Sequence, residues 1–180
     1  MEKVILYGND GGELKSIMIR AFSPLRKIRY FRNGVSSGIY GCGEKNMRLL
    51  DYTCSFFPEP GPCLFFFKGA ALPFGGLKLP SGYLPILESG NVSAATILAH
   101  TGGAAITCGM SPRDTLSLSS NGFPKALVSI QRDLRRADEQ IIEPADVPVT
   151  LSAPAPEYPL LAACAALLLL GPVTEGGLQV

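Results

Sequence analysis

Five consecutive apolar residues, 63–67, constrain the fold of this chain most strongly. They read Cys-Leu-Phe-Phe-Phe and lie between Gly61-Pro62 and Gly69. A strand with one face in water carries polar residues at every second position, whereas a strand covered on both faces does not. The run therefore predicts a strand that is buried on both faces, which is typical of the parallel sheets of α/β proteins.

Strand and helix alternate in the first third of the chain. Residues 4–7 form a short apolar run that ends in a glycine-rich turn, and apolar side chains then recur at helical spacing from Leu14 to Phe22, before Pro24. Residues 28–31 predict a second strand. Residues 34–62 show no clear period, so their structure and the strand order stay open.

Residues 83–108 predict a compact βαβ unit. The strand-like residues 83–87 are followed by Asn91 and Ser93, either of which can cap a helix that runs through Ile97 to His100. Residues 104–108 predict the next strand. Because two strands joined by a crossover helix run in the same direction, we expect these two strands to be parallel.

The pattern changes after residue 110. Apolar and polar residues alternate at 115–119, 126–132 and 147–151, which predicts antiparallel ribbons with one wet face. Residues 158–170 are almost wholly apolar and predict a buried helix. We therefore expect a single α/β domain over residues 1–172, with a mainly parallel, Rossmann-like sheet, a C-terminal antiparallel β-ribbon and a buried final helix, followed by a flexible tail at residues 173–180.

The composition is typical of a globular, cytoplasmic protein. Apolar residues make up 47% of the 180 residues and charged residues 17%, which is enough to bury a core. The five cysteines lie mostly in apolar runs, without a CxxC pair and with one histidine in the chain, so we expect reduced thiols and no metal site. About 14 helical residues in the apolar stretch that ends at Leu170 would span ~21 Å. A bilayer core requires ~20 helical residues, so we expect no membrane anchor.

The net charge is +1, but the charged residues are distributed unevenly along the chain. Residues 1–50 carry nine Lys and Arg against four Asp and Glu, whereas the rest carries seven against eleven. Basic residues alternate through 26–32, but only Tyr30 and Phe31 accompany them, which gives no aromatic platform for stacked bases. We expect a solvated strand face here and no nucleic-acid partner.

Four short segments in the second half of the chain occur in an order that can be compared with that of a known family. Residues 86–91 read Ile-Leu-Glu-Ser-Gly-Asn, residues 105–109 read Ala-Ile-Thr-Cys-Gly, and residues 114–120 read Asp-Thr-Leu-Ser-Leu-Ser-Ser. Pro156-Glu-Tyr-Pro159 then leads into an alanine- and leucine-rich stretch up to Gly171. In this order, residues 85–171 resemble the second half of the central domain of the Mur ligases, the ATP-dependent amide-bond-forming enzymes of peptidoglycan synthesis. The resemblance covers about half of the chain and implies a Mur-like fold.

The chain departs from the Mur pattern where the family binds nucleotide. Mur ligases hold ATP phosphates on a Gly-Lys-Thr loop, whereas residues 8–16 read Gly-Asn-Asp-Gly-Gly-Glu-Leu-Lys-Ser, with two residues too many between the glycines and the lysine. The family asparagine that contacts adenine falls at Glu88, and residues 156–159 lack the family histidine. The resemblance therefore implies the fold without the ligase chemistry, a degenerate nucleotide-binding site.

Candidate ligand-binding residues lie where the predicted parallel strands end, because ligands of open α/β sheets bind at that edge. They are Gly8, Asn9, Gly11, Gly12, Lys15, Ser16, Asn33, Glu88 and Asn91. The glycine turn can present N–H groups to an anion, with Lys15 and Ser16 in the first helical turn. The alternative is a plain turn capped by Asp10, since Asp10 and Glu13 place negative charge where a phosphate would sit.

The sequence assigns no catalytic residue and identifies no cofactor. Cys108 and His100 are the available nucleophile and base, but the βαβ geometry separates them by roughly 15–20 Å at ~3.3 Å per residue. Three functions stay open: a non-catalytic or degenerate Mur-ligase-like domain that binds a small molecule or a protein partner, a diverged ATP-dependent amide ligase, and a structural protein that forms homo-oligomers through an exposed ribbon edge.

Overall fold

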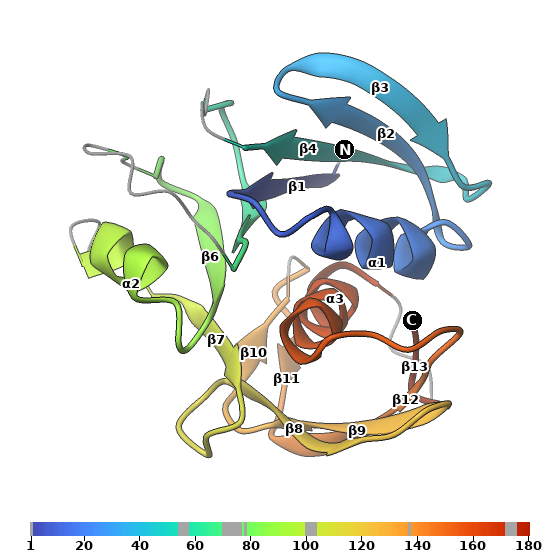
Figure 1. Ribbon diagram of the computed structural model, residues 1–180, viewed down its shortest axis with the longest axis vertical. Helices are drawn as coiled ribbons and strands as arrows, with labels where there is room; N and C mark the ends of the chain where they lie inside the picture. The colour runs from blue at the N-terminus through green and yellow to red at the C-terminus, as the bar shows by residue number, and fades with distance from the viewer. Residues whose placement is uncertain are drawn as a thin grey trace.

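The computed structural model describes residues 2–53, 58–69, 77, 79–99, 104–136, 138–171 and 176–180. In this part of the chain an eleven-stranded sheet has the strand order β13-β12-β9-β8-β7-β6-β5-β1-β4-β2-β3 (Figure 1). Its strands are β1 (Glu2–Tyr7), β2 (Arg26–Arg32), β3 (Val35–Tyr40), β4 (Lys45–Tyr52), β5 (Cys63–Phe67), β6 (Tyr83–Glu88), β7 (Ile106–Gly109), β8 (Leu116–Asn121), β9 (Lys125–Ile130), β12 (Ala145–Thr150) and β13 (Leu178–Gln179). A separate antiparallel pair consists of β10 (Leu134–Arg135) and β11 (Ile141–Ile142). The described helices are α1 (Glu13–Phe22), α2 (Val92–Ala99) and α3 (Glu157–Leu170).

The centre of the sheet is parallel. β2, β4, β1, β5, β6, β7 and β8 follow one another in space, and each is parallel to its neighbour. β3 is antiparallel to β2, and β9 is antiparallel to both β8 and β12. The α/β class and the mainly parallel sheet are thereby confirmed. The parallel pairing of β6 with β7, on either side of α2 in the chain, confirms the predicted βαβ unit.

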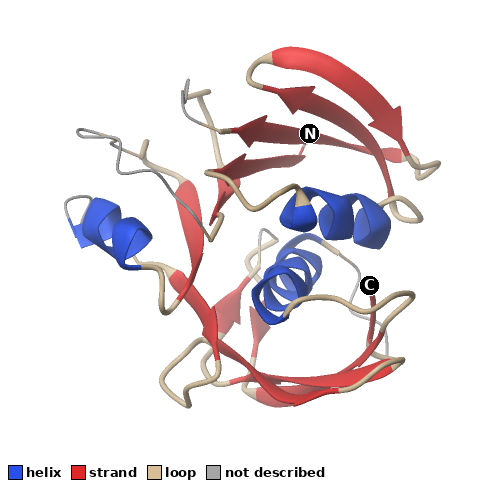
Figure 2. Cartoon of the chain, in the orientation of Figure 1, coloured by secondary structure: helices blue, strands red, loops and turns tan. Residues whose placement is uncertain are grey.

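Helices α1 and α3 lie together on one face of the sheet. Figures 1 and 2 show the sheet curling around them, with β1, β2 and β4 on one side and β8, β9 and β12 on the other. The apolar side of α1 and nearly the whole circumference of α3 are buried in one core. α3 has 14 residues, and no helix within the described residues combines the length and the apolar character needed to cross a bilayer.

Two arginine side chains bind the C-terminal carbonyl groups of α3. Arg26 Nη2 donates a hydrogen bond to Leu170 O at 2.7 Å, and Arg136 donates to Leu168 O at 2.9 Å and to Gly171 O at 2.8 Å. The last carbonyls of a helix lack backbone partners and carry partial negative charge. The two guanidinium groups therefore stabilise the end of a helix that contains no charged residue after Glu157.

The opposite face of the parallel strands has its own apolar core. Phe65 and Phe67 of β5 pack there with Ile5 and Tyr7 of β1 and with Ile97 of α2. The alternate residues of β5 belong to the α1–α3 core instead. Strand β5 is thus covered on both faces, as its unbroken apolar run predicts.

Strand β3 was not predicted from the sequence. It forms one edge of the sheet, antiparallel to β2, within the segment where no period is visible. Its side chains are almost all in contact with water, and Val35 and Ile39 are 68% and 62% exposed. Because neither face of the strand is buried, the sequence carries no alternation that would mark it.

The C-terminal residues also differ from the expectation. A flexible tail is expected over residues 173–180, but the described part of that segment holds β13, which pairs with β12 in parallel. Leu178 and Val180 are buried, and Val180 N donates to Thr150 O at 2.9 Å. Pairing with β12 and burial of these two apolar side chains in the α1–α3 core explain why residues 178–180 are ordered.

Candidate functional site

The parallel strands β1, β4, β5 and β6 end at one edge of the sheet, and we call this the carboxyl edge. The residues at or just after these strand ends include Asp10, Asp51, Lys68 and Asn91, and the structure brings them together. Only Asn91 is among the residues that the sequence selects for ligand binding. The chemistry of the edge therefore depends largely on residues outside that selection.

The glycine turn between β1 and α1 is capped by its own aspartate. Asp10 Oδ1 accepts a hydrogen bond from Gly12 N at 3.0 Å, and Asp10 Oδ2 accepts one from Leu14 N at 2.8 Å. Asn9 Oδ1 accepts one from Gly11 N at 3.3 Å. Of the two alternatives for this turn, the structure shows the one in which Asp10 caps the helix. The N–H groups of Gly12 and Leu14, which would bind an anion, are bonded to the carboxylate of Asp10.

Lys68 is buried at the end of β5, with 2% of its surface exposed. Its Nζ lies 2.5 Å from Asp51 Oδ1 and 3.6 Å from Asp10 Oδ1. Tyr30 donates its hydroxyl proton to Asp51 Oδ2 at 3.0 Å. A buried charge is tolerated only where opposite charges and hydrogen bonds compensate it. These four side chains, which we call the Lys68 cluster, satisfy one another.

The Lys68 cluster changes the ionisation of Tyr30. Burial is the main cause that raises the pKa of Tyr30 above its usual value of 10, and the negative charge of Asp51 and the hydrogen bond to it act in the same direction. Lys15, which the sequence places in the first turn of α1, lies with its Nζ 5.8 Å from the centre of the Tyr30 ring. The ammonium group of Lys15 therefore forms a cation–π contact with the Tyr30 ring beside the glycine turn.

Three of the candidate ligand-binding residues, Asn91, Asn33 and Ser16, form hydrogen bonds with backbone groups of the chain. Asn91 accepts a hydrogen bond from Ala94 N at 3.0 Å and donates one to Lys68 O at 2.9 Å, so it caps α2 and ties that helix to the end of β5. Asn33 accepts one from Thr53 N at 3.0 Å and has a positive φ of 48°. Ser16 donates its hydroxyl proton to Gly12 O at 2.8 Å. These side chains use their polar atoms to shape the edge.

A small hollow of about 200 Å³ lies beside the ends of β6 and β7, and we call it the Glu88 hollow. It contains Glu88, which the sequence selects, and Glu157 at the start of α3. The buried Tyr158 also lines it and donates its hydroxyl proton to Phe67 O. The lining residues are Glu88, Ser89, Gly90, Cys108, Gly109, Met110, Glu157, Tyr158 and Leu161. Its ionisable groups are two carboxylates, a thiol and a phenol.

The thiol and the phenol of the Glu88 hollow stay protonated at neutral pH. Burial raises the pKa of Cys108 far above its usual value of 9, and the neighbouring Cys164 and the acidic groups Asp114 and Glu88 add to this effect. Burial also raises the pKa of Tyr158 well above 10. Cys108 is therefore held as a neutral core thiol, and His100 lies outside the described residues. Within the described ranges, no group of three or more His, Cys, Asp or Glu is arranged to hold a metal ion.

Sequence reasoning missed Asp51, Lys68 and Tyr30. A local signal existed for Lys68, which directly follows the apolar run 63–67 and so lies at the carboxyl end of a buried strand. Asp51 lies in a segment whose period is ambiguous. Its pairing with Lys68 depends on the strand order β5-β1-β4, which a single sequence does not reveal.

The carboxyl edge of this mixed, mainly parallel α/β sheet thus contains a buried cluster of polar side chains that bind one another. The resemblance of residues 85–171 to the Mur ligase central domain stays a prediction. A scan against protein-family models finds no match for the chain, and a comparison with curated proteins finds none either.

Proposed function

We propose that this chain is a non-catalytic domain of Mur-ligase-like architecture that does not bind nucleotides. Its carboxyl edge instead binds an amine, either on a small molecule or on a lysine side chain of a protein partner. The main support is the position of the Asp10 carboxylate, which occupies the N–H groups of Gly12 and Leu14. In nucleotide-binding α/β proteins, the donors of this turn hold a phosphate.

Electrostatics at the same edge disfavours a phosphate. The Lys68 cluster combines one ammonium group with two carboxylates, so its formal charge is negative. An incoming phosphate would face Asp10 and Asp51 at short range, in surroundings where charges are weakly screened. It would also have to displace Asp10 from two backbone donors.

The Glu88 hollow supports an amine ligand. Glu88 is half-buried and Glu157 is exposed, and none of the lining residues carries a positive charge. An ammonium group donates hydrogen bonds to carboxylates, and such charge-assisted bonds are stronger than neutral ones. The volume of about 200 Å³ admits a primary amine but not a nucleotide.

Thermal unfolding with candidate ligands tests this proposal, because a ligand that binds the native state raises the Tm. The ligands are ATP, ADP, a UDP-sugar and NAD, each with and without Mg²⁺, and n-butylamine as the amine. We expect n-butylamine to raise the Tm of the wild type and of Glu143→Gln, but not of Glu88→Gln, while the nucleotides leave the Tm unchanged. A rise with ATP and Mg²⁺ that Lys15→Ala abolishes would instead favour a diverged ATP-dependent ligase.

The exposed edge of β3 favours self-association as a second candidate function. Val35, Ile39 and Tyr40 are exposed on a strand that carries no charged residue, and such edges pair readily with another strand. Sedimentation velocity should show a dimer at high concentration that Ile39→Lys dissociates. A wild type that stays monomeric excludes this candidate.

A further inference from the structure

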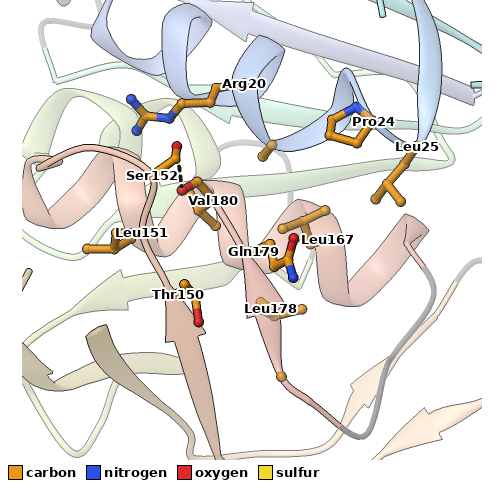
Figure 3. Close-up of a pocket in the computed structure, with 12 residues that line it drawn as sticks. Arg20, Pro24, Leu25, Thr150, Leu151, Ser152, Leu167, Leu178, Gln179 and Val180 are labelled. Carbon is orange, nitrogen blue, oxygen red and sulfur yellow. Dashed lines mark hydrogen bonds between the residues drawn. The ribbon is translucent and has the colours of Figure 1, made fainter. Parts of the chain in front are cut away.

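A second hollow lies between the C-terminal half of α1, the helix α3 and the strand β13. Figure 3 shows it from the side, with α1 above it and β13 below. Its volume is about 530 Å³, within the range of small-molecule sites. We call it the Arg20 hollow, and it shares no lining residue with the Glu88 hollow.

The inner surface of the Arg20 hollow is apolar. Ala21 of α1, Leu167 of α3 and Leu178 of β13 are all buried and line it, together with Leu25 and Leu151. Apolar surface of this kind binds a hydrocarbon body and excludes water.

Arg20 has the charged side chain among the residues of the lining. In the view of Figure 3 its guanidinium group lies above and to the left of Ser152, which also lines the hollow. The Nε atom of Arg20 is buried, and neither a hydrogen bond nor an ion pair joins the Arg20 side chain to any residue that the structure describes. Ser152 is already bonded, because its hydroxyl donates to Val180 O at 3.1 Å. A buried donor without a partner costs free energy, which a suitable acceptor would recover.

We propose that the Arg20 hollow binds a small amphiphilic carboxylate, with its aliphatic body on the leucines and its carboxylate on Arg20. A guanidinium group matches a carboxylate with two parallel hydrogen bonds. A singly charged head group balances the single arginine, whereas a phosphate monoester would bring up to about two negative charges. The other polar side chains of the lining, Thr150, Ser152 and Gln179, are neutral.

The first test compares octanoate with 1-octanol, which has the same body without the charge. We expect octanoate to bind the wild type about ten-fold more tightly or better, as one charge-assisted pair implies. Arg20→Gln should abolish this preference, and Arg29→Gln, which removes an exposed arginine and changes the net charge equally, should keep it. Isothermal titration calorimetry measures each dissociation constant. Equal binding of acid and alcohol, an unchanged preference in Arg20→Gln, or no binding of octanoate would overturn the proposal.

The second test locates the ligand. The chain contains no tryptophan, so a single introduced tryptophan reports on one place. Gln179→Trp puts it at the Arg20 hollow, and Phe123→Trp puts it at an exposed position outside the lining. 2-Bromooctanoate should quench the fluorescence of Gln179→Trp at the concentrations at which octanoate binds, and that of Phe123→Trp much less. Equal quenching of the two variants would show that the acid binds elsewhere or without a defined site.

Discussion

Lys68 Nζ and Asp51 Oδ1 lie 2.5 Å apart, although their strands, β5 and β4, are not neighbours in the sheet. The strand between them is β1, whose glycine turn contributes Asp10 as the second carboxylate near Lys68. Lys68, Asp51 and Asp10 therefore link the ends of three strands at the edge where an α/β sheet commonly binds its ligand. Lys68 therefore has a structural role at this edge.

The first prediction concerns this buried lysine. Lys68→Met keeps the aliphatic stem but leaves Asp51 as a buried carboxylate without its cation. We expect the free energy of unfolding to fall by about 3–5 kcal/mol, as for other broken buried ion pairs. Urea denaturation measures it. Lys125→Met is the matched control, because Lys125 is exposed at the start of β9 and its loss should change stability by no more than about 0.5 kcal/mol. Equal stability of the two variants would mean that the pair contributes little.

The second prediction concerns Asp10 as an internal substitute for a bound anion. Asp10→Ala removes the acceptor of two N–H groups, so we expect a loss of about 0.5–2 kcal/mol in the free energy of unfolding. The freed donors should then bind sulfate, which should raise the Tm of Asp10→Ala more than that of the wild type. Glu13→Ala removes a negative charge from the same turn without freeing those donors. If it responds to sulfate as strongly as Asp10→Ala, the effect is one of net charge alone.

The sequence predicts the elements whose side chains face a core. The run 63–67 and the spacing from Leu14 to Phe22 indicate β5 and α1 because burial imposes a period on the residues. The same criterion, a period in the apolar residues, does not identify strand β3, because most of its side chains are exposed to water. The two-residue strand β13 is too short for any pattern, and its order comes from pairing with β12 and from burial of Leu178 in the α1–α3 core.

The site was predictable where its chemistry is local. Asp10 and Asn91 cap helices that begin within four residues of them, and this role follows from their side chains and positions. The pairing of Lys68 with Asp51 is long-range. It depends on which strands flank β1, and the residues of β1 are equally apolar on both faces and so favour no particular neighbour.

The third prediction concerns pH. The pKa of Tyr30 is raised in the folded state, chiefly by burial and then by Asp51, whereas in the unfolded chain it is about 10. Below pH 10 both states hold the proton, so the folded state keeps its full stability. As the pH rises above 10, the unfolded state releases this proton first, and the free energy of unfolding falls. In Tyr30→Phe this fall should be shallower, measured by urea denaturation at several alkaline pH values. A slope equal to that of the wild type would mean that Tyr30 titrates alike in both states.

The last prediction concerns the reactivity of the thiols, and it bears on whether the domain is catalytic. Alkylation by iodoacetamide needs a thiolate that the reagent can reach. Cys42 is exposed, whereas Cys63, Cys108 and Cys164 are buried. Burial raises the pKa of Cys63 and of Cys164 to about 12, and it raises that of Cys108 further.

We therefore expect iodoacetamide to modify Cys42 in the native protein and to spare these three thiols, even when the pH rises from neutral to about 9. Peptide mapping by mass spectrometry resolves each site, and labelling in urea, which should modify all of them, is the control. Cys108 is the informative case, because it lines the Glu88 hollow beside two carboxylates. If Cys108 reacts as fast as Cys42 in the native state, the hollow holds an accessible, ionised nucleophile. A non-catalytic role for this edge would then be untenable.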